Sequence, residues 1–199
     1  MTGHPVTQMA REIAEMPDAA ARLSTPDARA ASRNVAARLR SLDPRALVTV
    51  ARGSSDHAAT YLGYAAQTTL NIPAASVGPS LATLYGASLR MEGLAAVAIS
   101  QSGASQDIIE LCQSLARSDG HVVVLTNTPG SPLASAGTAV IDIAAGPEQA
   151  VAATKSFLNS VIAGLWLIAD WAEDRALLDA LERLPDRLHS ADCAGAWPK

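Results

Sequence analysis

Small hydroxyl side chains and glycines gather in two short segments of the chain, residues 52–56 (Arg-Gly-Ser-Ser-Asp) and residues 100–107 (Ser-Gln-Ser-Gly-Ala-Ser-Gln-Asp). Each segment follows a short apolar run and precedes a helical pattern. A helix N-terminus offers unpaired backbone N–H groups and the positive end of the helix dipole, so such a loop binds an anion without lysine or arginine. The alternative is that the serines only cap the two helices. Two loops of the same design favour a phosphate ligand.

A third segment, residues 144–157, follows the last apolar run and enters a long helical pattern. Its Glu148 could hold a sugar hydroxyl or amine, or move a proton. It could equally be an acid favourably placed in the first turn of a helix. We expect Lys155 to be solvated, as most lysines are. We expect His57 to pack beneath the first helix rather than to face a ligand.

The elements that must position these segments are five short apolar runs that alternate with helical patterns. Such runs are typical of strands that are buried on both faces. Strands joined by helical crossovers are parallel, with helices on both faces of the sheet. The sequence therefore predicts an α/β fold with a doubly wound, five-stranded parallel sheet. A flavodoxin-like order, 2-1-3-4-5, places the two hydroxyl-rich loops at its ligand-binding switch point. The expected strands are 46–51, 74–77, 94–99, 121–126 and 139–143, and the expected helices between them are 56–70 and 107–117.

The chain divides into three expected regions. Residues 1–43 form an N-terminal helical arm with two short helices, interrupted by Pro17 and Pro26. Residues 44–190 form the main domain, which ends with a long apolar helix over 149–170 and a more polar one to about residue 189. Residues 191–199 are a linker or a truncated end. The long helix is more apolar than one sheet face needs, which favours a homodimer.

Composition excludes several classes of protein. Hydrophobic residues make up 49% of the chain and charged ones 17%, which indicates a folded domain. The net charge of −4 and the lack of a basic run argue against nucleic acid. The most apolar stretch, 157–172, is shorter than the ~20 residues of a membrane span. Neither loop matches a dinucleotide or triphosphate motif, and the two cysteines lack metal-ligand spacing. We therefore expect a cytoplasmic protein with no metal, no cofactor and no membrane contact.

Taken together, the three segments resemble the SIS (sugar isomerase) family, and within it the isomerase half of glutamine–fructose-6-phosphate aminotransferases. The likeness runs from about residue 9 to residue 190, and segment 9–17 resembles the stretch that precedes that half. The residues that carry it are Gly53-Ser54-Ser55, Ser100-Gln101-Ser102-Gly103 with Ser105, and Glu148 with the segment Val151 to Phe157.

The resemblance implies a hexose or hexosamine 6-phosphate as ligand. It implies that the phosphate is bound by Ser54, Ser55, Ser100, Gln101, Ser102 and Ser105. It also implies that Gly53 and Val151 line the sugar and that Glu148 is the catalytic group. The family opens the sugar ring and moves a proton between C1 and C2.

The sequence shows neither a glutaminase half with its N-terminal cysteine nor a second SIS domain, which carries further acid–base residues in the family. A partner subunit or a missing half would then complete the site. One alternative is a non-catalytic phosphosugar sensor, although residues 1–40 have too few basic residues for the helix-turn-helix of such regulators. Another is a single-domain isomerase with Glu148 or His57 as its base.

Overall fold

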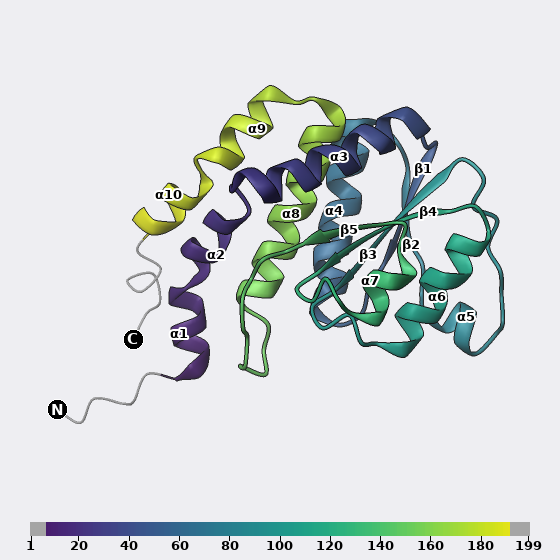
Figure 1. Ribbon diagram of the computed structural model, residues 1–199, viewed down its shortest axis with the longest axis horizontal. Helices are drawn as coiled ribbons and strands as arrows, with labels where there is room; N and C mark the ends of the chain where they lie inside the picture. The colour runs from purple at the N-terminus through teal and green to yellow at the C-terminus, as the bar shows by residue number, and fades with distance from the viewer. Residues whose placement is uncertain (1–6, 192–199) are drawn as a thin grey trace.

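A single five-stranded sheet forms the centre of the molecule in the computed structural model, which describes residues 7–191. All neighbouring strands are parallel, in the order β2-β1-β3-β4-β5 (Figure 1). The predicted α/β fold and strand order are confirmed. The strands are β1 (Ala46–Val50), β2 (Ala74–Ser76), β3 (Leu94–Ser100), β4 (His121–Thr126) and β5 (Ala139–Asp142).

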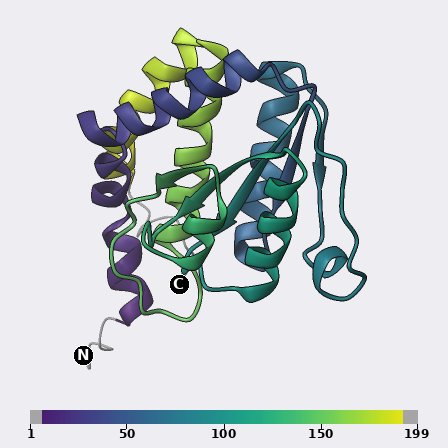
Figure 2. The ribbon, with the colours of Figure 1, turned by 45° about the vertical axis from the view of Figure 1, so that its right-hand side comes forward.

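Helices cover both faces of the sheet, as the uninterrupted apolar strands require. One face packs against α4 (Ser54–Leu70) and α8 (Lys155–Ala172), and the other packs against α6 (Gln106–Arg117) and α7 (Pro132–Ala136), with α5 (Ser80–Thr83) beside α6 (Figures 1 and 2). Side chains along β3 alternate between the two cores: Val97 enters the first and Ala98 the second.

The N-terminal region contains three helices rather than the expected two: α1 (Gln8–Ala14), α2 (Met16–Arg22) and α3 (Pro26–Leu42). The interruptions predicted at Pro17 and Pro26 are present between these helices. Each lies in the first two positions of a new helix, where the missing N–H costs nothing. The last of the three, α3, packs across α8 and β5 and places Val35, Ala36 and Leu39 in the core (Figure 2).

The C-terminal helices differ from the prediction in two ways. Helix α8 begins at Lys155 instead of residue 149, and two short helices follow it, α9 (Arg175–Glu182) and α10 (Leu184–Ser190), where one was expected. Most of the apolar surface of α8 is covered within the chain by α3 and α4, while Phe157 is exposed; the homodimer stays a prediction. Among the described helices, none is long and apolar enough to cross a membrane. The end expected to be a linker lies, from residue 192 on, outside the described residues.

Candidate functional site

The two hydroxyl-rich segments lie side by side at the carboxyl edge of the sheet, as the strand order predicts. Their strands, β1 and β3, are direct neighbours, with Val50 in register with Ala98. Across the gap between the loops, Arg52 Nη1 donates to Asp107 Oδ2 at 2.8 Å. This ion pair joins the loop after β1 to the first turn of α6.

The helices that follow these loops begin without side-chain caps. Gly53 occupies the N-cap of α4 and Ser105 that of α6, and neither residue forms a side-chain cap hydrogen bond. In the first turn of α6, Asp107 Oδ1 accepts from the N–H of Ile108 at 3.0 Å. Helix α4 begins at Ser54, two residues earlier than predicted. The capping alternative therefore does not describe these serines, and both N-termini keep N–H groups available to an anion.

The serine loop, residues 100–105, takes its shape from its own side chains. Ser100 is buried, and its Oγ accepts a hydrogen bond from the N–H of Gly103 at 3.2 Å. Ser102 is exposed, and its Oγ accepts from the N–H of Ala104 at 3.3 Å. Gly103 has φ +61°, and a β-carbon there would collide with the Ser131 side chain. Ser100 thus shapes the loop, whereas Ser102 faces solvent, where a ligand can reach it.

The remaining predicted phosphate ligands lie in the serine loop and in the segment after β1, and they differ in solvent exposure. Ser54 is exposed, and Ser55, Gln101 and Ser105 are half-buried. The backbone carbonyl of Gln101 accepts from the N–H of Asn127, which ties the serine loop to the end of β4.

Glu148 lies in the loop before α8 and binds the N-terminus of that helix from six to eight residues away. Its Oε1 accepts from the N–H and the hydroxyl of Thr154, at 3.0 and 2.8 Å, and from the N–H of Ser156 at 3.1 Å. Its Oε2 accepts from the Ser156 hydroxyl. Burial raises the pKa of the Glu148 carboxyl, but the bonds from Ser156 and Thr154 outweigh burial, and its pKa lies below the ordinary value. The carboxylate is ionised at neutral pH.

The loop of Glu148, residues 143–154, is held from outside by the N-terminal helices, and we refer to it as the arm-held loop. Glu12 on α1 is buried and accepts from the N–H groups of Gln149, at 2.6 Å, and Ala150, at 3.2 Å. The first of these bonds is the main reason why the pKa of Glu12 is lowered. Lys155 Nζ donates to Glu15 and to the Pro147 carbonyl at 2.7 Å.

The expectation that Lys155 is solvated is wrong, because its side chain is only 2% exposed. A buried ammonium needs a partner, and Glu15 of the arm supplies it. His57 is exposed on α4, so the expectation that it packs beneath the helix is also wrong. Val151 is fully exposed in the arm-held loop.

Asn127, which the sequence analysis did not single out, links the serine loop to the arm-held loop. In addition to its bond with Gln101, its side chain donates to the Gly146 carbonyl and accepts from the N–H of Ala145, both at 2.8 Å. Its position directly after β4 could have identified it from the sequence, because ligands of such sheets bind at the carboxyl ends of the strands. A cavity of about 520 Å³ opens beside it, lined also by Arg22, Asp142, Ala144, Gly146 and Pro147.

Comparison with known proteins decides the family. The SIS domain model matches residues 42–169, which include the serine loop and Glu148. The chain belongs to the SIS family. It is 34% identical over 164 residues to a glutamine–fructose-6-phosphate aminotransferase of Symbiobacterium thermophilum, which covers 76% of this chain and 26% of that protein.

Solved SIS structures superpose closely on this chain. A Silicibacter pomeroyi protein assigned as a phosphosugar isomerase is 49% identical with a TM-score of 0.90, over 93% of this chain and 56% of that one. The C-terminal domain of the Francisella tularensis glucosamine–fructose-6-phosphate aminotransferase, at 22% identity and a TM-score of 0.74, covers 95% and 55% and shares the fold. The SIS chain described here thus spans about a quarter of its curated relatives and about half of these solved chains.

Proposed function

We propose that this SIS domain binds the phosphate of a hexose or hexosamine 6-phosphate between the serine loop and the N-terminus of α4. The observation that carries the proposal is the pairing, on neighbouring strands, of two helix N-termini whose N-cap residues form no side-chain cap bond; the Arg52–Asp107 ion pair lies between them. In this arrangement Ser102 and Ser54, both exposed, donate hydroxyls to the phosphate. The half-buried Ser55, Gln101 and Ser105 line the same site, and the backbone at Gly53 and the side chain of Val151 border the sugar.

The reaction we propose is aldose–ketose isomerisation of an amino-sugar phosphate, or the related amination or deamination. The similarity to aminotransferases and to a phosphosugar isomerase supports this class. Glu148 lies three residues before Val151, one of the two proposed sugar contacts. Because the four accepted hydrogen bonds stabilise the ionised form and lower its pKa, the carboxylate is a weak base. It suits accepting a hydrogen bond from a sugar hydroxyl better than taking a proton from carbon.

The proton-transfer groups are then supplied by a second SIS domain or a partner subunit. A phosphosugar sensor is the second candidate. The Vibrio vulnificus protein NanR, which shares the fold (19% identity, TM-score 0.67), was solved in complex with ManNAc-6P. Turnover separates the two candidates.

The first experiment is calorimetric titration of the chain with fructose 6-phosphate, glucosamine 6-phosphate, galactosamine 6-phosphate and inorganic phosphate, followed by NMR of each mixture. Binding with isomerisation supports an enzyme that carries its own acid–base residues. Binding without turnover supports a phosphosugar site that another domain or subunit completes, or a sensor. If no sugar phosphate binds, the proposal is wrong.

The Ser102→Asp variant tests the location of the phosphate. A carboxylate at this exposed position repels a phosphate, so we expect sugar-phosphate binding to be lost. The matched control is Ser41→Asp, which adds the same charge at an exposed position near the end of α3, on the opposite edge of the sheet. Equal binding by both variants would contradict the assignment.

A further inference from the structure

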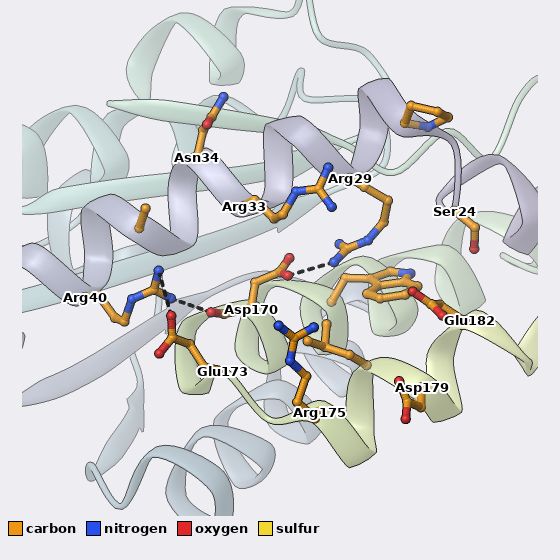
Figure 3. A pocket seen from close by; sticks show the side chains of 14 residues that line it. Ser24, Arg29, Arg33, Asn34, Arg40, Asp170, Glu173, Arg175, Asp179 and Glu182 are labelled. Atoms are coloured by element: carbon orange, nitrogen blue, oxygen red, sulfur yellow. Dashed lines mark hydrogen bonds and ion pairs between the residues drawn. The ribbon is translucent and has the colours of Figure 1, made fainter.

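A larger cavity lies at the other end of the molecule from the proposed phosphate site. It has a volume of about 850 Å³ and is enclosed by α3, the C-terminal end of α8 and α9 (Figure 3). Asp170 in its wall is 15 residues beyond Lys155 on α8, which corresponds to about 22 Å at 1.5 Å per residue. The two sites are therefore separate.

Three buried polar atoms at this cavity have no hydrogen-bond partner among residues 7–191. They are Arg29 Nη1, Trp166 Nε1 and Ser24 Oγ. The Arg29 side chain is 10% exposed and lies 3.5 Å from the centre of the Trp166 ring. An unsatisfied buried polar group is costly, and three around one cavity indicate a missing partner. Guanidinium and indole N–H groups can only donate, so that partner must supply acceptor oxygens.

The carboxylate of Asp170, in the wall of this cavity, already has two hydrogen-bond donors. Asp170 accepts from Arg29 Nη2 at 2.7 Å and from the Ser32 hydroxyl at 2.8 Å. It therefore pairs with Nη2 of the Arg29 guanidinium and leaves Nη1 without a hydrogen-bond partner.

Two further cations line the cavity from opposite walls. Arg175 on α9 points toward Asp170 in Figure 3, whereas the side chain of Arg33 runs along α3 on the other side of Asp170. Within the described part of the chain neither arginine forms an ion pair. Arg40 pairs with Glu173 at 3.5 Å. Asp179 and Glu182, further along α9, are the opposing charges. The arginines thus gather at the end of the cavity near Asp170, and Asp179 and Glu182 lie toward the other end.

We propose that this cavity is a second ligand site, which binds the carboxylate or phosphate oxygens of a small metabolite. The oxyanion lies between Arg33 and Arg175 and accepts hydrogen bonds from Arg29 Nη1 and Trp166 Nε1. The volume of the cavity falls in the range of small-molecule sites. Because Asp179 and Glu182 repel a highly charged ligand, the site favours a compact anion or one with a cationic or hydroxyl group at its far end.

The indole N–H resonance of Trp166 provides a direct readout, since a new acceptor at Nε1 shifts it. The protein is titrated with inorganic phosphate and, separately, with citrate, at constant ionic strength; Trp166→Phe assigns the signal. We expect a saturable shift with at least one of the two probes. In the Arg33→Ala/Arg175→Ala variant, whose changes are both at exposed positions, we expect affinity to fall roughly tenfold.

The matched control, Asp179→Asn/Glu182→Gln, removes two charges of the opposite sign and should keep or strengthen binding. A response to phosphate alone identifies a phosphate site, and a response to citrate alone a carboxylate site. The proposal is overturned if neither probe shifts the signal, as expected when only buried water satisfies the donors. It is also overturned if the shift persists unchanged without Arg33 and Arg175. Ser102→Asp leaves the shift intact, so this test is independent of the proposed phosphosugar site.

Discussion

The serine loop and the arm-held loop reach the same edge of the sheet by different means. The serine loop is shaped by its own residues, Ser100 and Gly103, and by the adjacent end of β4. The arm-held loop is fixed by Arg22, Glu12 and Glu15, from 122 to 140 residues away in sequence. A loop of the first kind forms wherever its strand and helix form. A loop of the second kind is fully held only when the N-terminal helices are docked.

The strongest way to break the serine loop is Gly103→Ala. The positive φ disfavours any side chain, and the new β-carbon would collide with Ser131. We expect a loss of about 3 kcal/mol in the free energy of unfolding, measured by urea titration. The control is Gly130→Ala, where a β-carbon meets only open space. A loss equal to that of the control would show that the loop relaxes freely.

The arm-held loop is tested by Lys155→Met, which keeps the buried volume but removes the ammonium. Glu15 and the Pro147 carbonyl both lose their partner, and we expect a cost of about 2 kcal/mol. In this variant we expect faster hydrogen exchange at the amides of residues 148–154 in the arm-held loop, and no change at those of residues 101–105 in the serine loop. An equal increase in both loops would show that they open as one unit.

The Glu148→Gln variant tests the same loop through pH. An amide keeps one acceptor oxygen but loses the charge, so we expect a loss of about 1 kcal/mol near neutral pH. Because the pKa of Glu148 is lowered on folding, its stabilising effect is fully present above the ordinary pKa of 4.5 and is lost as pH falls through the folded value. The difference between wild type and variant should therefore shrink below about pH 4.5. A difference that stays constant down to acid pH would contradict the lowered pKa.

The same contrast explains what the sequence could predict. Five apolar runs predicted the five strands, most clearly β1, β3 and β4, because strands buried on both faces have a local signature. The strand order was predicted from the flavodoxin-like fold class. The serine loop could also be predicted, because its hydroxyl side chains and its glycine are consecutive in sequence between a strand and a helix. The predicted start of α8 was six residues too early, because the alanine-rich segment 149–154 has helical composition. In the structure, N–H groups of this segment donate to the carboxylates of Glu12 and Glu148 instead of forming helical hydrogen bonds.

Burial of Lys155 could not be predicted either, because its partner Glu15 reaches it only after α1 and α2 dock. Asn127 was missed because its role depends on Gly146 and Ala145, which come from another strand end. Contacts of this kind follow from tertiary structure.

The smallest effect is expected at the Arg52–Asp107 ion pair, which couples the serine loop to the loop after β1. Arg52 is 59% exposed, so Arg52→Ala should cost only about 0.5 kcal/mol in unfolding. The variant nevertheless frees the Asp107 carboxylate at the N-terminus of α6, where it competes with a bound phosphate. We expect sugar-phosphate affinity to fall several-fold at low salt and less at high salt, measured by calorimetry. Asp107→Asn, which removes that carboxylate as well as the pair, should bind at least as tightly as wild type. Loss of affinity in both variants would instead assign the ion pair the role of holding the two loops together.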